Sequence, residues 1–281
     1  MNIMAFITIA RPKQWLKNLM VFFPPFLSGS MGIAWFRLDA LTPFAAFCCA
    51  SSATYILNDY LDREHDAHHP VKRLRPIPSG EISGSSALSG ACVLVVASVL
   101  FSFLISFQFL LYLLLYLAVT TAYSLRLKHL AIFDIFCISC GFVLRLYSGG
   151  VAYNVTISSW LFLTVFLLSV FLSAGKRYSE RYSLGEQAGC HRTALNSYSE
   201  GFLETIMTIS AASVLGTYSL YVINKPLLVY TVPLCIFGLL RYMLMVKSGG
   251  DGNPTDALIK DIPLMIIGII WVSAVTVSVY R

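Results

Sequence analysis

The sequence has very little charge for its length. Only 12% of its 281 residues are charged, whereas soluble domains carry about 25%, and 57% are hydrophobic. A chain with so few charges cannot form a water-soluble surface, which excludes the ordinary soluble globular class. The composition predicts an all-α integral membrane protein with one transmembrane domain over residues 1–281. Its expected environment is the lipid bilayer, and we expect no nucleic-acid partner.

The motifs of common soluble enzymes are also missing. No Ser/His/Asp or Cys/His nucleophile set, P-loop or dinucleotide fingerprint is visible. Among the seven cysteines, Cys137 and Cys140 form a C-x-x-C pair, but they lie in an apolar window without a second ligand pair, so we assign them no metal or redox role. The apolar start precedes Arg11, which is the reverse of the order in a cleavable signal peptide.

Long apolar windows with few charges predict nine membrane crossings. The windows are 19–35, 41–57, 87–123, 130–151, 158–174, 203–222, 227–245 and 258–280. At 1.5 Å per residue the third window would reach about 55 Å, nearly twice the ~30 Å hydrocarbon core, so we predict a turn near Ser106. Pro24 and Pro25, followed by Gly29 and Gly32, are expected to interrupt the first helix.

The basic residues predict the orientation of the chain. Sixteen lysines and arginines fall at the N-terminus or in connections on the same side. Only Arg37, Lys225 and Arg281 fall on the other side, and Arg145 lies inside a span. The positive-inside rule therefore places the N-terminus in the cytoplasm. Every acidic residue except Asp39 shares that face. We predict a multi-pass protein of the cell inner membrane whose site faces the cytoplasm and takes an anionic, metal-bearing substrate.

The densest cluster of acids follows the second predicted span. Asp59, Asp62 and Asp66 are spaced i, i+3, i+7, so on a helix their carboxylates fall within about 60° and point the same way. The helix dipole disfavours negative charge at a helix C-terminus, so a positive group must compensate. Mg²⁺ is usually bound by one or two carboxylates together with substrate phosphates. The cluster therefore predicts a magnesium site.

The basic residues after this cluster allow a second interpretation. Lys72, Arg73 and Arg75 lie on a short connection closed by Pro76 and could neutralise the acids as solvated loop charges. The fork of an arginine also matches phosphate oxygens, and lysine acts as a compact charge. Phosphate capture is therefore the functional alternative for these three cations.

A further charge lies inside a predicted span. Arg145 follows Asp134 by eleven residues, so on a helix both share a face and Arg145 lies about 16 Å deeper. An arginine at that depth normally faces a polar cavity, which favours a functional role. Asp134 also has a structural explanation as an acid at a helix N-terminus. Likewise, Lys17 belongs to a mixture of cations and Trp15 that is typical of an interfacial anchor.

Taken together, the motifs resemble a known family. Asn-Asp-x-x-Asp-x-x-x-Asp at 58–66 resembles the first signature of the UbiA-type superfamily of intramembrane prenyl-substrate transferases. The stretches 11–18, 75–80, 123–128, 141–145 and 175–177 are similar to the decaprenyl-phosphate phosphoribosyltransferase branch. The resemblance implies a nine-helix UbiA-type bundle around a cytoplasm-facing polar cavity.

The resemblance also implies roles for individual residues. Asp59, Asp62, Asp66 and Arg145 would be catalytic, and the three aspartates would bind Mg²⁺. The implied substrate-binding residues are Lys17, Asn18, Asn58, Lys72, Arg73, Arg75, Tyr123, Lys128, Asp134, Lys176 and Arg177. The implied enzyme is a transferase that moves a 5-phosphoribosyl group from phosphoribosyl diphosphate to a polyprenyl phosphate. Nothing in the sequence demands an oligomer.

One departure separates this chain from the wider superfamily. UbiA-type prenyl-diphosphate transferases carry a second aspartate-rich motif where this chain has 176–180, Lys-Arg-Tyr-Ser-Glu. The main alternative, prenyl transfer to an aromatic or quinone-precursor acceptor, would need Glu180 with Glu186, or Asp256 with Asp261, and neither spacing is convincing. A transporter that uses Arg145 would require two similar halves, and no such repeat is visible.

Overall fold

The computed structural model describes residues 3–32, 38–68, 72–184, 193–225, 227–250 and 252–281. Every regular element in these ranges is an α-helix or a 3₁₀-helix (η), which confirms the predicted all-α class. The elements are α1 Ile3–Ala10, η1 Pro12–Phe22, α2 Phe23–Ser28, η3 Leu38–Leu41, α3 Thr42–Leu61, α4 Arg63–Ala67, η4 Lys72–Leu74, α5 Gly84–Phe103, α6 Phe107–Leu125, η5 Leu127–His129, α7 Phe133–Ala152, α8 Ser159–Leu184, α10 Thr193–Asn196, α11 Glu200–Val222, η7 Leu228–Thr231, α12 Val232–Lys247, α13 Pro254–Lys260 and α14 Ile262–Tyr280.

Seven segments are long and apolar enough to cross a membrane among the described residues. They are Gly84–Phe103, Phe107–Leu125, Phe133–Ala152, Ser159–Ser183, Gly201–Val222, Leu228–Lys247 and Ile262–Tyr280. The predicted turn is confirmed, because α5 ends at Phe103 and Ser106 caps α6 by accepting a hydrogen bond from the Phe109 backbone N–H. The two remaining predicted windows overlap the η1–α2 segment and helix α3. Helix α3 has buried polar residues such as Ser51.

The first window does not form a continuous helix. The chain runs as a 3₁₀-helix to Phe22, changes to an α-helix at Phe23, and ends that helix at Gly29, whose φ is 75°. Pro24 and Pro25 lie in the first turn of α2, where a missing backbone N–H costs little. The interruption expected from these prolines is confirmed. Residues 33–35 of that window lie outside the described ranges.

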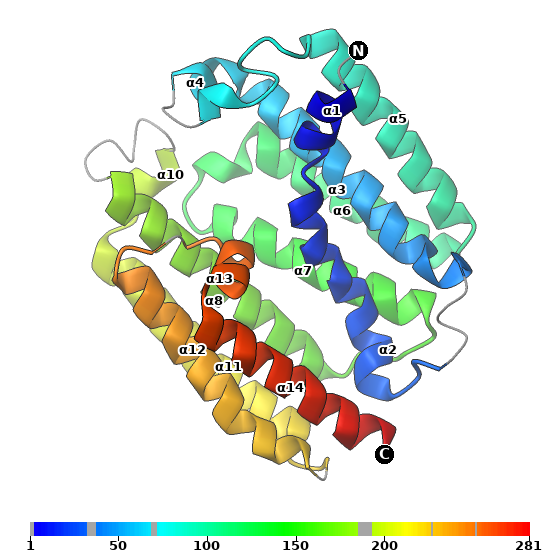
Figure 1. The fold of residues 1–281 in the computed structure, drawn as a ribbon, viewed down its shortest axis with the longest axis vertical. Helices are drawn as coiled ribbons and strands as arrows, with labels where there is room; N and C mark the ends of the chain where they lie inside the picture. The colour runs from blue at the N-terminus through cyan, green and yellow to red at the C-terminus, as the bar shows by residue number, and fades with distance from the viewer. Residues whose placement is uncertain (1–2, 33–37, 69–71, 185–192, 226, 251) are drawn as a thin grey trace.

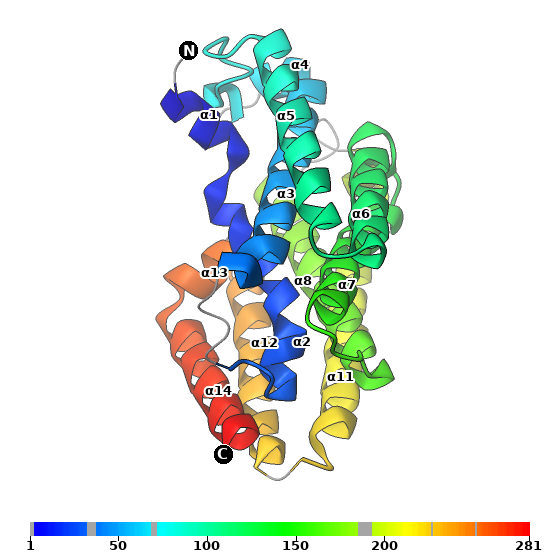
Figure 2. The same ribbon diagram turned by 90° about the vertical axis from the view of Figure 1, so that its right-hand side faces the viewer.

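The helices form two groups joined by α7. Figure 1 shows α3 and α5 on one side and α8, α11, α12 and α14 on the other, and Figure 2 shows the same grouping from a second direction. Helix α7 packs against α6 and against α8, and η1 packs against α3 and α7. The two chain ends lie at opposite ends of the long axis (Figure 1). Because η1 contacts both α3 and α7, the segment 12–22 runs between the two groups.

A glycine allows η1 to lie directly against α7. A Cβ at Gly149 would lie 2.1 Å from the backbone oxygen of Val21. Because the obstacle is backbone rather than a mobile side chain, a larger residue would push the two elements apart. Val21 is fully buried at this contact. The close approach fixes the position of the preceding turn of η1, which carries Lys17 and Asn18.

Candidate active site

The acidic motif lies at a break between two helices. Helix α3 ends at Leu61, Asp62 has φ −90° and ψ 0°, and α4 begins at Arg63. The prediction that three carboxylates share one face of a single helix is therefore corrected. Asp59 and Asp66 both accept hydrogen bonds from the same nitrogen, Nη1 of Arg75, at 2.9 and 2.7 Å. Asp62 instead binds Nζ of Lys128.

Additional polar groups complete both parts of this motif. Arg11 donates to Asp59 at 2.6 Å, and Lys72 lies 3.4 Å from Asp66. On the other side, Asn58 donates to Asp62 at 3.1 Å and accepts a hydrogen bond from Lys128 at 3.4 Å. We call the residues Arg11, Asn58, Asp59, Asp62, Asp66, Lys72, Arg75 and Lys128 the acidic-motif cluster. Loop and helix-end cations thus neutralise the acids, and the same cations are placed to meet a phosphate.

The donor chemistry of the cluster fits Mg²⁺. No group of three or more His, Cys, Asp or Glu side chains is arranged to hold one metal ion within the described ranges. Mg²⁺ needs only one or two carboxylates when substrate phosphates supply other ligands. Asp59 and Asp66 meet this need, because they already flank one positively charged nitrogen. Asp62 and Asn58 form a neighbouring oxygen pair. The acids of the motif thus form two oxygen groups, Asp59 with Asp66 and Asp62 with Asn58, and the assignment of Mg²⁺ to Asp59, Asp62 and Asp66 stays a prediction.

A second network joins α7 to α8. Arg177 donates to Asp134 at 2.6 Å, to Glu180 at 2.5 Å and to the hydroxyl of Tyr123 at 3.2 Å. Asp134 also accepts a hydrogen bond from the hydroxyl of Tyr198. Arg177 is only 1% exposed and Asp134 is completely buried. These five residues are called the α7–α8 network. Arg177, Asp134 and Tyr123 thus contact one another inside the protein, and their role in substrate binding stays a prediction.

Arg145 lies in a third environment. Its Nε donates to Oδ1 of Asn18 at 2.8 Å, and its two terminal nitrogens donate to the Gly141 carbonyl and the Tyr116 hydroxyl, each at 2.9 Å. The guanidinium also lies over the Tyr116 ring, 4.6 Å from its centroid. Asn18 in turn donates to Ser51 at 3.0 Å. Arg145 thus ties η1 to α3, α6 and α7, and it is 4% exposed.

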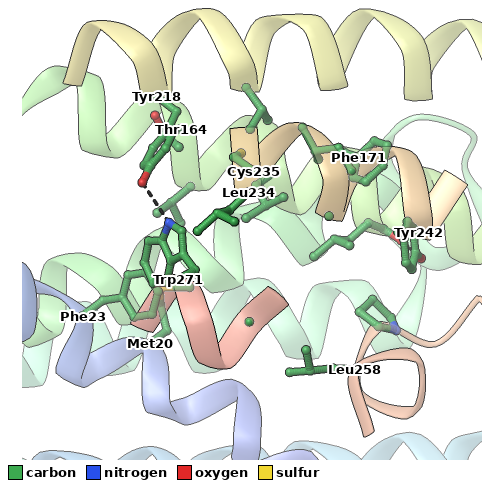
Figure 3. A pocket seen from close by; sticks show the side chains of 18 of the residues that line it. Met20, Phe23, Thr164, Phe171, Tyr218, Leu234, Cys235, Tyr242, Leu258 and Trp271 are labelled. Carbon is green, nitrogen blue, oxygen red and sulfur yellow. Dashed lines mark hydrogen bonds between the residues drawn. The ribbon is translucent and has the colours of Figure 1, made fainter. Parts of the chain in front are cut away.

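An apolar cavity of about 440 Å³ has Lys17 and Met20 of η1 on its wall. It lies among η1, α2, α7, α8, α11, α12, α13 and α14. Figure 3 shows Phe23, Trp271 and Tyr218 along one part of its wall, where the Trp271 indole donates to the Tyr218 hydroxyl at 2.8 Å. The rings of Phe23 and Trp271 stack with centroids 6.2 Å apart. A wall of this kind suits a hydrocarbon chain.

Lys17 is the cation on the wall of this cavity. It precedes the first predicted span, and it is partly buried. Arg145, Arg11 and Arg177 act on the Lys17 ammonium as like charges, against a weaker opposing effect of Asp256. Lys17 forms no ion pair with the residues that the structure describes, so an ammonium in this place favours an anionic ligand.

The remaining predicted residues lie less centrally. Arg73 is exposed on η4, and Lys176 lies 3.9 Å from Glu180. Glu186, which the alternative acid pair requires, lies outside the described residues. Asp256 lies in the first turn of α13, where Asn253 donates to it at 2.5 Å.

Sequence reasoning missed three residues of these networks. Arg11 lies in the stretch 11–18 that carries the family resemblance, but the sequence analysis gave it no role of its own. Tyr116 and Tyr198 gave no signal, because their partners are 29 and 64 positions away.

The comparisons with known proteins agree with this architecture. The chain belongs to the UbiA prenyltransferase family, whose model matches residues 21–267. It is therefore a transferase embedded in a membrane, as the sequence predicted. The fold resembles a UbiA homolog from Archaeoglobus fulgidus bound to GPP and Mg²⁺, with a TM-score of 0.76 at 21% identity, covering 99% of this chain and 100% of that one.

Curated relatives are similar over nearly the whole chain. Decaprenyl-phosphate phosphoribosyltransferase from Mycolicibacterium smegmatis is 33% identical over 294 residues, which cover 98% of this chain and 92% of the relative. The protein of the same name from Mycobacterium tuberculosis strain H37Rv is 32% identical over 279 residues, which cover 96% of this chain and 92% of the relative. The predicted superfamily and branch are both confirmed as the best description of the similarity.

Proposed function

We propose that this protein transfers a 5-phosphoribosyl group from phosphoribosyl diphosphate to a polyprenyl phosphate, in a Mg²⁺-dependent reaction at the cytoplasmic face of the membrane. The observation that carries the proposal is the similarity to the two mycobacterial transferases over nearly the full length of both partners. The structure supports it, because Lys17 lies on the wall of an apolar cavity and belongs to η1, which begins next to Arg11, an ion-pair partner of Asp59.

The distribution of charge favours a phosphate-rich substrate pair. At the end of α8 the chain has Lys176 and Arg177, and the nearby acids Asp134 and Glu180 are engaged by Arg177. Those two carboxylates are therefore not free to form a second metal site for a prenyl diphosphate. Arg75 and Lys128, by contrast, line the acidic-motif cluster, where they can contact phosphate oxygens when the carboxylates bind a metal.

The reaction needs little acid–base help from the protein. An oxygen of the polyprenyl phosphate forms a bond to C1 of the ribosyl group while the bond from C1 to the diphosphate oxygen breaks, which releases diphosphate. When bound, Mg²⁺ supplies Lewis-acid stabilisation of the leaving diphosphate, and Asp59, Asp62 and Asp66 are the residues whose carboxylates would hold it. The chain's own task is to bring several anions together and hold them in line, which the fixed cations accomplish.

The proposed membrane arrangement has nine crossings with the N-terminus in the cytoplasm. The seven apolar segments supply seven of them, and α3 with the η1–α2 segment supplies the other two. The support for the orientation is the excess of basic residues in the connections on one side. This arrangement would place the acidic-motif cluster where a water-soluble sugar diphosphate can reach it.

The proposal is tested by measuring label transfer with purified protein. Radiolabelled phosphoribosyl diphosphate and a polyprenyl phosphate are incubated with and without Mg²⁺, in parallel with the Asp62→Ala variant. We expect labelled lipid only with Mg²⁺ and the intact aspartate. Label transfer from a prenyl diphosphate to an aromatic acid, without any labelled phosphoribosyl lipid, would overturn the donor and establish prenyl transfer instead.

A further inference from the structure

Two positive charges in the interior of the site have no acidic partner. Every other cation within the clusters described above forms an ion pair, with Asp59, Asp62, Asp66, Asp134 or Glu180. Lys17 and Arg145 form none with the described residues. Arg145 is held by neutral oxygens of Asn18, Gly141 and Tyr116. Because unpaired charge in a protein interior is costly, this part of the site is built to receive an anion.

Lys17 and Arg145 belong to one local structure. Lys17 is followed directly by Asn18, the residue that accepts the Nε hydrogen bond of Arg145. Arg145 also acts on Lys17 as a like charge, so the two groups repel each other. An anion bound at the ammonium would remove that repulsion. The surroundings of Lys17 then decide which anion fits.

The 3₁₀ geometry of η1 places Lys17 in a row with apolar residues. In a 3₁₀-helix, side chains three residues apart lie directly above one another. Lys17 and Met20 are such a pair, and Phe23 continues the row at the start of α2. All three line the apolar cavity. The row thus presents one cation followed by hydrocarbon surface, which matches an amphiphile with a charged head and an apolar chain.

We propose that Lys17 binds the phosphate of the polyprenyl phosphate acceptor, with the first isoprene units of that lipid in the apolar cavity. This assignment rests on the proposed function, and it divides the anions of the reaction between two places. The acidic-motif cluster serves the sugar diphosphate donor, and Lys17 serves the lipid.

The donor itself does not suit the Lys17 position. Phosphoribosyl diphosphate carries hydroxyls and phosphates over its whole surface, and burying such groups against hydrocarbon without hydrogen-bond partners is unfavourable. Leu16 and Met20 are the cavity neighbours of Lys17 on η1. Around Asp59 and Asp66, in contrast, the cations Arg11 and Arg75 are partly exposed and can bind a polar ligand. The apolar surroundings of Lys17 therefore favour the lipid, and the polar surroundings of Asp59 and Asp66 favour the sugar diphosphate.

The test compares Lys17→Met with Lys13→Met. Lys13 is an exposed cation on the same 3₁₀-helix, so its removal changes the net charge of η1 without touching the cavity. We expect Lys17→Met to raise the KM for polyprenyl phosphate about tenfold or more, since charged hydrogen bonds are worth that much, with the KM for phosphoribosyl diphosphate within about twofold. Lys17→Arg should recover most of the loss. A rise in the donor KM instead, or no change in either, would overturn the assignment.

A binding experiment separates failure of this assignment from failure of the proposed function. Purified protein is titrated with polyprenyl phosphate and with the matching polyprenol, which lacks the phosphate. Wild type should prefer the phosphate about tenfold or more, and Lys17→Met should lose that preference while still binding polyprenol, which also shows that the variant is folded. If wild type shows the preference but transfers no phosphoribosyl group, the lipid site stands and the donor is wrong. If Lys17→Met keeps the preference, the Lys17 assignment is wrong.

Discussion

The acidic-motif cluster and the α7–α8 network contain similar ion pairs in very different surroundings. In the first, the Asp59 side chain is 2% exposed but its partners Arg11 and Arg75 are 27% and 31% exposed. In the second, the Arg177 and Asp134 side chains are 2% and 0% exposed. Cations that reach solvent can exchange a carboxylate for an incoming phosphate or metal-bound substrate. A pair closed off on both sides cannot, so it holds helices in place.

The largest expected effect comes from breaking the closed pair. Asp134→Ala leaves the Arg177 guanidinium buried with only Glu180 as an acidic partner, and removing one member of a buried pair costs about 3–5 kcal/mol of unfolding free energy. Thermal unfolding of the purified protein in detergent measures the loss. The control is Glu64→Ala, because the Arg63–Glu64 pair is exposed and is worth about 1 kcal/mol or less. Equal unfolding temperatures for the two variants would contradict the distinction.

The acidic-motif cluster should show the opposite pattern, with a large loss of activity and a small loss of stability. Asp62→Asn is expected to lower the transfer rate about 10²- to 10³-fold, the usual cost of losing one group that stabilises reacting charge, and to leave the unfolding temperature close to that of wild type. The Asp62 side chain is 30% exposed and that of Lys128 only 5%, but the amide oxygen of the new asparagine and Oδ1 of Asn58 can still accept hydrogen bonds from the Lys128 ammonium. Glu64→Gln, on the adjacent helix α4, is the matched control for the rate. A large drop in unfolding temperature would show that Asp62 is mainly structural.

A third variant tests the cavity against the charged clusters. Gly238 lines the cavity, and a Cβ there would meet only Leu264 Cδ1 at 4.0 Å, so a larger residue fits the backbone and fills the space. We expect Gly238→Leu to raise the KM for the lipid acceptor about tenfold, since methylene groups in an apolar pocket change selectivity by that order, with the donor KM unchanged. Gly216→Leu, on the exposed side of α11, is the control. An equal effect of both variants would count against a lipid-binding cavity.

The sequence predicted the parts of the fold that depend on local composition. Six of the eight apolar windows, the turn at Ser106 and the interruption at Pro24 are properties of single segments, and the structure confirms them. The 3₁₀ conformation of 12–22 and the helix break at Asp62 were not predictable, because each depends on packing against other segments. At η1 the deciding contact is Gly149 against Val21, from residues far apart in the chain.

The sequence predicted which residues belong to the candidate site better than it predicted which of them form ion pairs. The acids Asp59, Asp62 and Asp66 and the cations around them do come together. Which cation meets which acid could not be predicted, because Lys128 and Asp62 are 66 positions apart and Arg177 and Asp134 are 43 apart. Several nearby arginines and lysines have the same charge and similar reach. The packing of α7 against α8 buries the Arg177–Asp134 pair, whereas the Arg75–Asp59 pair stays partly exposed.

The 3₁₀ conformation of η1 has a consequence for how this segment can vary. With three residues per turn, Trp15, Asn18 and Val21 form one row toward α3 and α7, and Lys17 lies in the row along the cavity. Deleting one residue ahead of Lys17 would rotate everything before it by about 120° relative to the rest. Arg11 would then leave Asp59, although every side chain was still present. Evolution and engineering can therefore change residues in this segment more easily than its length.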